Sequence, residues 1–331
     1  MKRSLMTRRH AVFSMGAFAV STLPTVGRAE PPIRLATIVV GLSAGGATDV
    51  AARRLAEGIR ESYAKVVVVD NRTGAGARLA VQHVKAAAPN GSSLLLTPAS
   101  MMAIYPHTYK DLAYDPVKDL VPVARVSTTE LGYGVGSAVP ESVKSMADYQ
   151  TWIKTSAAAA TFGHGATGSG PHFLGELLGR MSGVHMVQSG YRGSQPALLD
   201  LLGGHIPAVA APLGEFLPHM KSGKIRMLAV TGNTRSRFLP EAPTFKALGI
   251  ALSDMTEWFG VFAPAGTSDR MVQQASAAIK TALNNPELIN AFGLMGMETA
   301  WSSSTDLGVR LKSDIERWRG VVKQIGFTAQ S

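Results

Sequence analysis

The strongest constraint on the fold is a regular alternation of short apolar runs with segments of helical periodicity. Residues 33–40 are typical of a strand, and apolar residues that recur four apart predict a helix over residues 49–62. Residues 66–69 are a continuous β-branched run, which indicates a parallel strand covered on both faces. A helix ending near Val84 and a strand at residues 93–97 complete a βαβαβ pattern. This pattern predicts an α/β fold.

A second set of α/β elements begins near residue 130. Its predicted elements are helices over residues 146–155, 171–181 and 196–202 and strands over residues 160–162 and 225–230. The C-terminal residues 306–325 carry apolar side chains at helical spacing and predict one long amphipathic helix. The chain is long enough for two domains.

Residues 1–29 have the composition of a secretory signal peptide. A basic start is followed by apolar or small residues from Ala11 to Leu23 and by the small-x-small sequence Gly27-Arg28-Ala29. Thr7-Arg8-Arg9 is compatible with the twin-arginine export route, and the general secretory (Sec) route is the alternative. We therefore expect an exported, soluble mature protein.

Charge and cysteine content exclude several classes of protein. Without residues 1–29, 28 basic residues remain against 23 acidic ones, a net charge of +5. The mature part has no basic run of the kind that binds nucleic acid, so we expect no nucleic-acid partner. The chain has no cysteine, which excludes disulfides, thiol nucleophiles and cysteine-ligated metals. We expect no cofactor.

The stretch TFGHGATGSGPH at residues 161–172 raises three interpretations. Gly163, Gly165 and Gly168 spell G-x-G-x-x-G, but the strand before them is weak and the next aspartate is Asp200, 32 residues beyond Gly168. A dinucleotide site requires a strong strand and an acidic residue about 20 positions on. A glycine-rich loop without a ligand is the second interpretation. The third is an anion site at the start of a helix.

The anion interpretation gains support because the construction occurs twice. Residues 167–170 precede a predicted helix, and residues 41–49 also join a strand to a helix, with Thr48 and Asp49 as cap candidates. Unpaired backbone N–H groups and the helix dipole favour an anion at such positions. We therefore expect two domains that face each other across a cleft. Thr48 and Ser169 are predicted to lie across that one cleft.

Taken together, residues 31–331 resemble the substrate-binding receptors of tripartite tricarboxylate transporters, the Bug family. The resemblance rests on GGATD at 45–49, NRTGAGA at 71–77, APNG at 88–91, YDPVKDLVPV at 114–123, SGPHFLGELL at 169–178, GYRGSQPALLDLLGG at 190–204, LPHMKSGKIRMLAVT at 217–231 and WFGVFAPAGT at 258–267. These motifs extend over essentially the whole mature sequence.

The resemblance implies a two-domain periplasmic-binding-protein fold, type II-like, with the ligand cleft between the domains. Its boundaries would be residues 1–29 for the signal peptide, 30–131 together with 257–331 for the first domain, and 132–256 for the second. Such receptors are periplasmic, catalyse no reaction, and deliver an organic anion to large and small membrane subunits of a transporter. We expect a monomer.

The resemblance also implies which residues bind the solute, here a mono- or dicarboxylate that is possibly aromatic. The loops at 42–49 and 164–172 would hold one carboxylate, and a third loop beginning at Ser100 would face the cleft. The expected ligand-binding residues are Leu42, Ser43, Ala44, Gly45, Gly46, Ala47, Thr48, Asp49, Ser100, Met101, His164, Thr167, Gly168, Ser169, Gly170, His172 and Ala211. For His172, capping or packing of its own loop is the alternative, and for Met101 and Met102 it is core packing.

The resemblance is incomplete at positions that bear on the ligand. Ala211 and Pro212 stand where the family often has a polar pair, and Ala44 stands where it has proline. A cleft without acidic or carbonyl partners would not satisfy an ammonium group. We therefore expect a plain carboxylate to bind at least about tenfold more tightly than an amino acid of similar size.

Two other functions remain as alternatives. A periplasmic sensor that presents its bound state to a signalling protein would use the same cleft. An exported hydrolase would need an activated nucleophile and a base, and the sequence identifies no such pair, so we expect no enzymatic activity and no catalytic residue. The histidines lack metal-binding spacing, so no metal site is expected.

Overall fold

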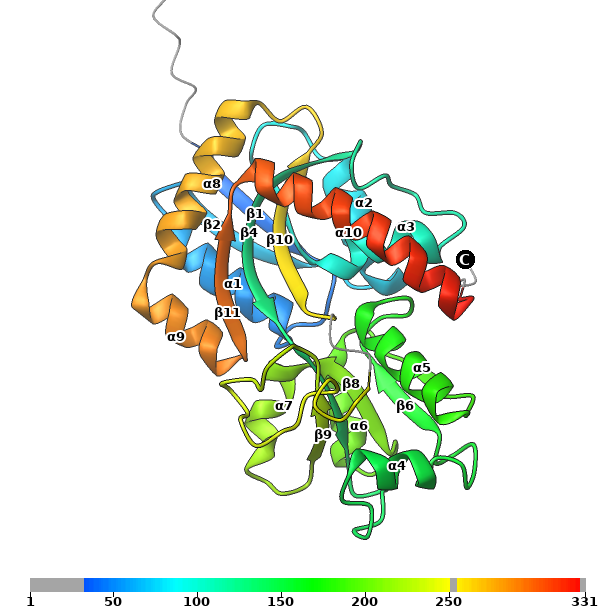
Figure 1. Cartoon of the computed structure of the whole chain (residues 1–331). Coiled ribbons are helices and arrows are strands. Elements are labelled where there is room, and N and C mark those ends of the chain that lie inside the picture. The colour runs from blue at the N-terminus through cyan, green and yellow to red at the C-terminus, as the bar shows by residue number, and fades with distance from the viewer. Residues whose placement is uncertain (1–32, 251–254, 328–331) are drawn as a thin grey trace, which may run out of the picture. The chain divides into compact units, whose positions relative to one another are not determined.

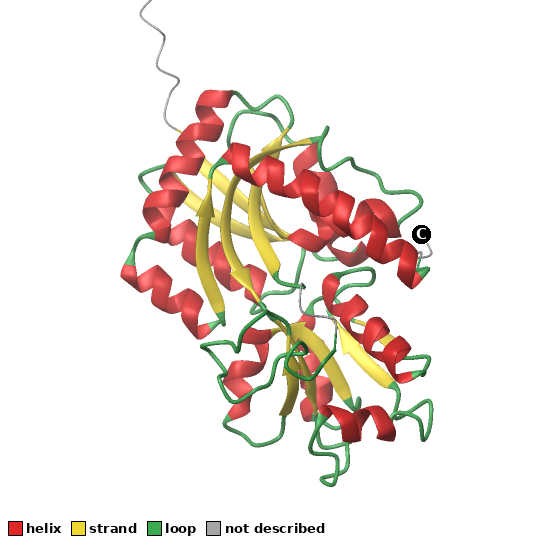
Figure 2. Cartoon of the chain, viewed as in Figure 1, coloured by secondary structure: helices red, strands yellow, loops and turns green. Residues whose placement is uncertain are grey.

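The computed structural model describes residues 33–250 and 255–327, which form two β-sheets flanked by helices (Figures 1 and 2). The first sheet has the strand order β11-β4-β10-β3-β1-β2 and the second β7-β6-β8-β5-β9. The strands of the first sheet are β1 (Ile33–Val40), β2 (Ala64–Asn71), β3 (Ser93–Pro98), β4 (Leu120–Thr129), β10 (Glu257–Pro264) and β11 (Met297–Ser302). Those of the second are β5 (Leu131–Val135), β6 (Thr161–His164), β7 (Val187–Gly190), β8 (Ala208–Pro212) and β9 (Arg226–Val230).

Helices cover both faces of the first sheet. Successive strand residues point to opposite faces, and apolar side chains are buried on each face. One buried cluster joins Ile38 and Leu96 to α1 (Ala47–Ile59), α8 (Asp269–Leu283) and α9 (Pro286–Leu294). The other face packs against α2 (Arg78–Lys85), the π-helical segment η2 (Ser100–Ile104) and α10 (Ser304–Ile325). Two short elements complete this half: η1 (Ala75–Ala77) and α3 (Tyr105–Thr108).

The second sheet is also sandwiched between helices. On one face lie α4 (Met146–Trp152) and α5 (Gly170–Ser182), and on the other α6 (Ser194–Leu202) and α7 (Leu213–Met220). Strand β6 pairs in parallel with β7 and β8, whereas β5 pairs antiparallel with β8 and β9. Both sheets are thus mixed, and the α/β fold expected from the sequence is confirmed.

The chain passes between the two sheets at Glu130, which separates β4 from β5, and again between β9 and β10. The C-terminal helix α10 then packs on the first sheet, as the amphipathic pattern predicted. These crossings agree in outline with the domain boundaries expected above, which remain a proposal. Residues 1–29, interpreted as a signal peptide, lie outside the described residues.

One expectation about the first sheet was wrong. The β-branched run at residues 66–69 does form a parallel strand, but among the described strands β2 lies at the edge of the sheet and pairs only with β1. Its Val66 and Val68 side chains are 49% and 41% exposed. A continuous apolar run predicts burial on both faces only when the strand also has neighbours on both edges, and position in the sheet is not encoded locally.

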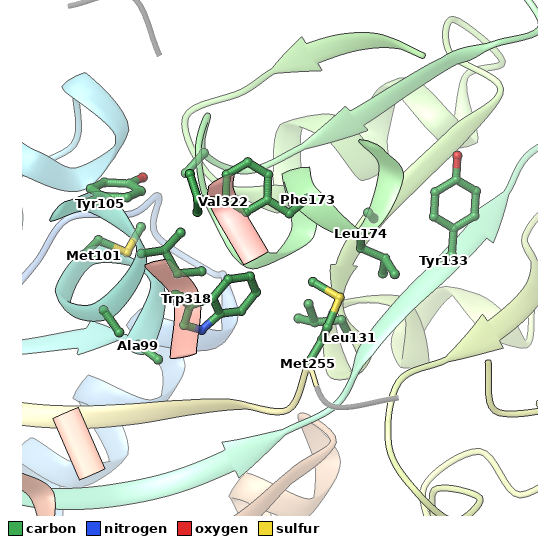
Figure 3. Close-up of a cluster of buried hydrophobic side chains, with 14 of the residues drawn as sticks. Ala99, Met101, Tyr105, Leu131, Tyr133, Phe173, Leu174, Met255, Trp318 and Val322 are labelled. Carbon is green, nitrogen blue, oxygen red and sulfur yellow. The ribbon is translucent and has the colours of Figure 1, made fainter. Parts of the chain in front are cut away.

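A shared apolar cluster links the two halves around the C-terminal helix. Figure 3 shows Met101 and Trp318 from the first half together with Phe173 and Leu174 from α5. The ring centroids of Phe173 and Trp318 are 6.2 Å apart, within the range of favourable aromatic contacts. The core is therefore continuous between the sheets on the side of α5 and α10.

Helix α4 carries a side-chain cap whose contribution to the stability of the protein can be measured. The Ser145 side chain accepts a hydrogen bond from the Asp148 N–H, and Asp148 accepts one from the Ser145 N–H, which forms a capping box. Replacing Ser145 with alanine is expected to lower the free energy of unfolding by about 1 kcal/mol. Urea denaturation of the variant measures this loss, and an unchanged midpoint would contradict it.

Candidate functional site

A small cavity lies where loops that follow strands of both sheets meet. Its volume is about 30 Å³, on the scale of one water molecule. The lining comes from the segments after β1, β3, β6, β7 and β8 and from the start of β10: Leu42, Thr48, Pro98, Ser100, Met101, Gly165, Ala166, Ser169, Pro171, Gly193, Ser194, Pro212, Glu215, Glu257 and Phe259. Carboxyl ends of strands in α/β sheets are the usual place for a ligand site. An organic solute would require these loops to move apart.

Helices α1, α5 and α6 are three of the helices that begin at this cavity. Their N-terminal residues include Thr48 in the first turn of α1, Ser169 at the N-cap of α5, and Ser194 as the first residue of α6. The prediction that Thr48 and Ser169 lie across one cleft agrees with their shared lining of the cavity. Helix N-termini carry unpaired N–H groups and a partial positive charge, so their convergence favours an anion.

Glu215 places a carboxylate at the first of these helices. Its Oε1 atom accepts a hydrogen bond from the Ala47 N–H at 3.1 Å, and its Oε2 atom accepts one from the Gln195 side chain at 3.2 Å. The side chain is 4% exposed, and burial raises the pKa of Glu215 to about 7. The protein's own carboxyl group thus occupies the N-terminus of α1, where we expected the solute carboxylate.

Glu257 is the second buried acid of the cavity. Its Oε1 atom accepts hydrogen bonds from the Ser100 N–H at 3.1 Å and from the Ser100 hydroxyl at 2.5 Å. The Ser100 oxygen in turn accepts from the Gly170 N–H at 3.0 Å, which connects η2 to the start of α5. Burial raises the pKa of Glu257. No described residue donates a hydrogen bond to its Oε2 atom.

The cavity carries no compensating cation. Among the described residues that line it there is no lysine, arginine or histidine. Thr48 and Ser194 are 3% and 8% exposed, and neither hydroxyl donates to another described residue. Ser169 donates to the Ala166 carbonyl at 2.6 Å. The cavity lining therefore combines two buried acids with free hydroxyls and helix N-termini.

The structure distributes the predicted residues unevenly around this cavity. Leu42, Thr48, Ser100, Met101 and Ser169 line it. Others lie in the same loops or first turns without lining it: Ser43, Ala44, Gly45, Gly46, Ala47, Asp49, Thr167, Gly168 and Gly170. Met102 and Ala211 are buried in the apolar clusters. Their roles in binding stay predictions.

Asp49 supports the first loop from within. It accepts hydrogen bonds from the Gly45 N–H and from the side chains of Arg53 and Asn71. Burial acts to raise the pKa of Asp49, but these hydrogen bonds outweigh it and hold the pKa below its usual value. The expectation that Thr48 or Asp49 caps α1 was wrong, because the N-cap is Gly46 and the first N–H of the helix, at Ala47, donates to Glu215.

The two predicted histidines lie behind the second loop, outside the cavity lining. His172 is fully buried, and its Nδ1 atom accepts a hydrogen bond from the Gly168 N–H at 3.0 Å, which is the loop-packing role given as its alternative. His164 pairs with the Gln188 side chain, and burial lowers the pKa of His164 to about 3. The His164 ring is therefore neutral near pH 7 and supplies no positive charge to an anion.

Sequence reasoning missed Glu215, Glu257 and Ser194. The expectation that the cleft offers no partner for an ammonium group is therefore wrong, since two carboxyl groups line the cavity. A local signal existed for Glu257, which is the one charged residue of the apolar stretch EWFGVFAP. Glu215 likewise stands in the first turn of a helix that follows the apolar strand AVAAP.

Within residues 33–250 and 255–327 no group of three or more metal-ligating side chains comes together. Over the same residues, no helix combines the length and apolar character needed to cross a bilayer.

Comparisons with known proteins identify the family. Residues 51–327 match the family described as TctC, tripartite tricarboxylate transporter family receptor. The chain is 30% identical to protein BugT of Bordetella pertussis over 97% of this chain and 98% of that one. The structure of the periplasmic binding protein BugD superimposes with a TM-score of 0.85 at 27% identity, covering 91% of this chain and 100% of BugD. R. palustris Rpa4515, solved with adipate, gives a TM-score of 0.85 at 29% identity, covering 90% and 99%. The chain belongs to the tripartite tricarboxylate transporter receptor family and is a solute-binding receptor of the Bug type.

Proposed function

We propose that this receptor captures an organic carboxylate in the periplasm and delivers it to the large and small membrane subunits of a tripartite tricarboxylate-type transporter. The observation that carries the proposal is the convergence of three helix N-termini and two free hydroxyls on one buried cavity. A carboxylate there accepts from N–H and O–H donors without a basic side chain. The adipate bound by Rpa4515 supports a carboxylate ligand.

Closure of the two halves around the solute is the motion that this function requires. Three hydrogen bonds near the cavity join the halves: Ala47 N–H to Glu215, Gly170 N–H to Ser100, and the Tyr109 hydroxyl to the Thr167 carbonyl at 2.8 Å. Opening breaks these bonds and widens the cavity. A bound solute would replace some of them and favour the closed form.

A thermal-shift screen over organic acids tests the function. A solute that binds only the native protein adds about 2.7 kcal/mol of stability at 100 times its dissociation constant. We expect at least one mono- or dicarboxylate to raise the melting temperature of the mature protein, and matched amines without a carboxylate to have no effect. Stabilisation by amines alone would contradict a carboxylate receptor.

The hydroxyl of Thr48 provides the matched variant. Thr48→Val keeps the side-chain shape and removes the donor, so the affinity for the carboxylate found in the screen should fall about tenfold or more. Thr151→Val is the control, because Thr151 donates to the Ala147 carbonyl on the exposed face of α4. Equal affinity of the Thr48 variant and the wild-type protein would show that the carboxylate binds elsewhere.

A further inference from the structure

Ser43 and Gly193 bring the two halves of the receptor into contact beside the cavity. Ser43 lies in the loop after β1, and Gly193 is the N-cap residue of α6, which packs on the second sheet. A Cβ atom built on Gly193 would lie 2.3 Å from the Ser43 Oγ atom and 3.1 Å from the Ser43 nitrogen. Ordinary contact begins near 3.4 Å, so alanine fits here only if the two loops separate by about 1 Å.

Each of these loops is hydrogen-bonded within its own half. In the second half, the Gly193 N–H donates to the Gly165 carbonyl at 2.8 Å. In the first half, the Asn71 side chain donates to the carbonyl of Leu42, the residue before Ser43, at 3.2 Å. Because both loops are held, a Cβ atom at residue 193 would push the halves apart instead of displacing one loop.

The contact is steric and depends on the missing side chain of Gly193. The Ser43 Oγ atom is buried and has no hydrogen-bond partner among the described residues. Gly193 also has a φ angle of +106°, which L side chains rarely adopt, so alanine would strain the local backbone as well. A test must therefore separate this local strain from the contact with Ser43.

We propose that Gly193 is a positioning residue that sets how closely the two halves approach each other around the solute. The inference rests on the proposed function, because it assumes that a solute carboxylate is held between the halves. Thr48 of the first half and Ser194 of the second both line the cavity, and they follow Ser43 and Gly193 closely in the sequence.

The hydroxyls of Thr48 and Ser194 make the approach of the halves important for binding. A carboxylate accepts from both only within the distance range of an O–H···O hydrogen bond, about 2.5 to 3.0 Å. A solute widens the cavity when it enters, and glycine leaves the halves free to close again to the separation that both donors require. Alanine would set a minimum separation and leave one hydroxyl out of reach.

Calorimetric titration of the full mature receptor with succinate, adipate and benzoate measures the effect on binding. For the acid that the wild-type protein binds most tightly, Gly193→Ala should lower the affinity about tenfold or more. In a Ser43→Ala background the same substitution should lower it about twofold or less, because the nearest remaining atom of residue 43 is 3.1 Å from the added Cβ. The strain at residue 193 is the same in both backgrounds, so this relief identifies the contact with Ser43.

Distances between spin labels measure the separation of the halves without any solute. The chain has no cysteine, so Glu57→Cys on α1 and Leu199→Cys on α6 place two labels at exposed positions of opposite halves. Gly193→Ala should lengthen the mean label distance by about 1 Å or more, and Ser43→Ala should reverse the increase. Gly223→Ala is the control for a positive φ angle, because Gly223 has a φ of +66° and no atom within 4 Å of an added Cβ. That control should change neither the distance nor the affinity.

The outcomes separate this inference from the proposed function. If Gly193→Ala leaves the label distance or the affinity unchanged, or if its effect persists in the Ser43→Ala background, the inference fails and the carboxylate receptor stands. If the wild-type protein binds neither these three acids nor any acid of the thermal-shift screen, the proposed function fails. The label distances would still decide whether Gly193 sets the approach of the halves.

Discussion

Replacing Glu215 with glutamine is expected to stabilise the receptor by about 3 kcal/mol at pH 8. The side chain is buried, and the pKa of Glu215 is raised by burial to about 7 from an ordinary value of 4.5. The Ala47 N–H and the Gln195 side chain oppose this effect without cancelling it. Glutamine keeps an oxygen acceptor for Ala47 and removes the ionisation that burial penalises.

The direction of the pH dependence follows from proton linkage. Between about pH 4.5 and pH 7 the native state holds a proton on Glu215 that the unfolded state has released, so stability falls as the pH rises through this window. Above about pH 7 the full free-energy cost of burying the ionised Glu215 lowers the stability, and below about pH 4.5 this cost is absent. The stability difference between variant and wild type should therefore grow from near zero to its maximum across the window.

Urea denaturation of both proteins at several pH values from about 4 to 8 measures this difference. Glu241→Gln serves as the control, since that side chain is exposed and its removal should leave the curve unchanged. Comparison with the wild-type protein at each pH cancels the contribution of Glu257, whose pKa is raised in the same direction. A variant less stable than the wild type at about pH 8 would contradict the expectation.

The fold was largely predictable because its signals are local. The spacing of apolar residues predicts a helix over residues 306–325, and in the structure α10 extends over Ser304–Ile325. The sheet positions were not predictable in the same way. Strand β2 looks like a central strand from its valines, but its neighbours are decided by pairings with distant segments.

The candidate site shows the same division between local and distant information. The loops at residues 41–49 and 164–172 are visible as glycine-rich segments before helices, and both contribute to the cavity. The roles of the two acids are not visible in the sequence. Glu215 contacts Ala47 across 168 residues of sequence, and Glu257 contacts Ser100 across 157. Only tertiary packing buries these carboxyl groups and points them at the helix N-termini.

Gly214→Ala is the other substitution for which we expect a large effect. Gly214 lies in the first turn of α7, where a Cβ atom would stand 1.5 Å from the Met295 carbonyl oxygen and 2.0 Å from its carbon. Met295 directly follows α9, which packs on the first sheet, whereas α7 packs on the second. The added methyl group would therefore force the two backbone segments apart. Clashes with flexible side chains relax at small cost, but neither backbone segment can rotate away.

The expected loss exceeds the gain in helix propensity. Alanine favours a helix over glycine by about 1 kcal/mol, and overpacking in a filled interior costs about 1 to 3 kcal/mol or more. With a main-chain overlap this close, we expect Gly214→Ala to lower the free energy of unfolding by at least about 3 kcal/mol.

Gly320→Ala is the matched control, because Gly320 is an interior residue of α10 with no atom within 4 Å of an added Cβ. That control should be as stable as the wild type or more stable by up to about 1 kcal/mol. Parallel urea titrations of the two variants measure both changes. Equal stabilities would contradict the expectation, because they would mean that the backbone at Gly214 and Met295 moves apart at little cost.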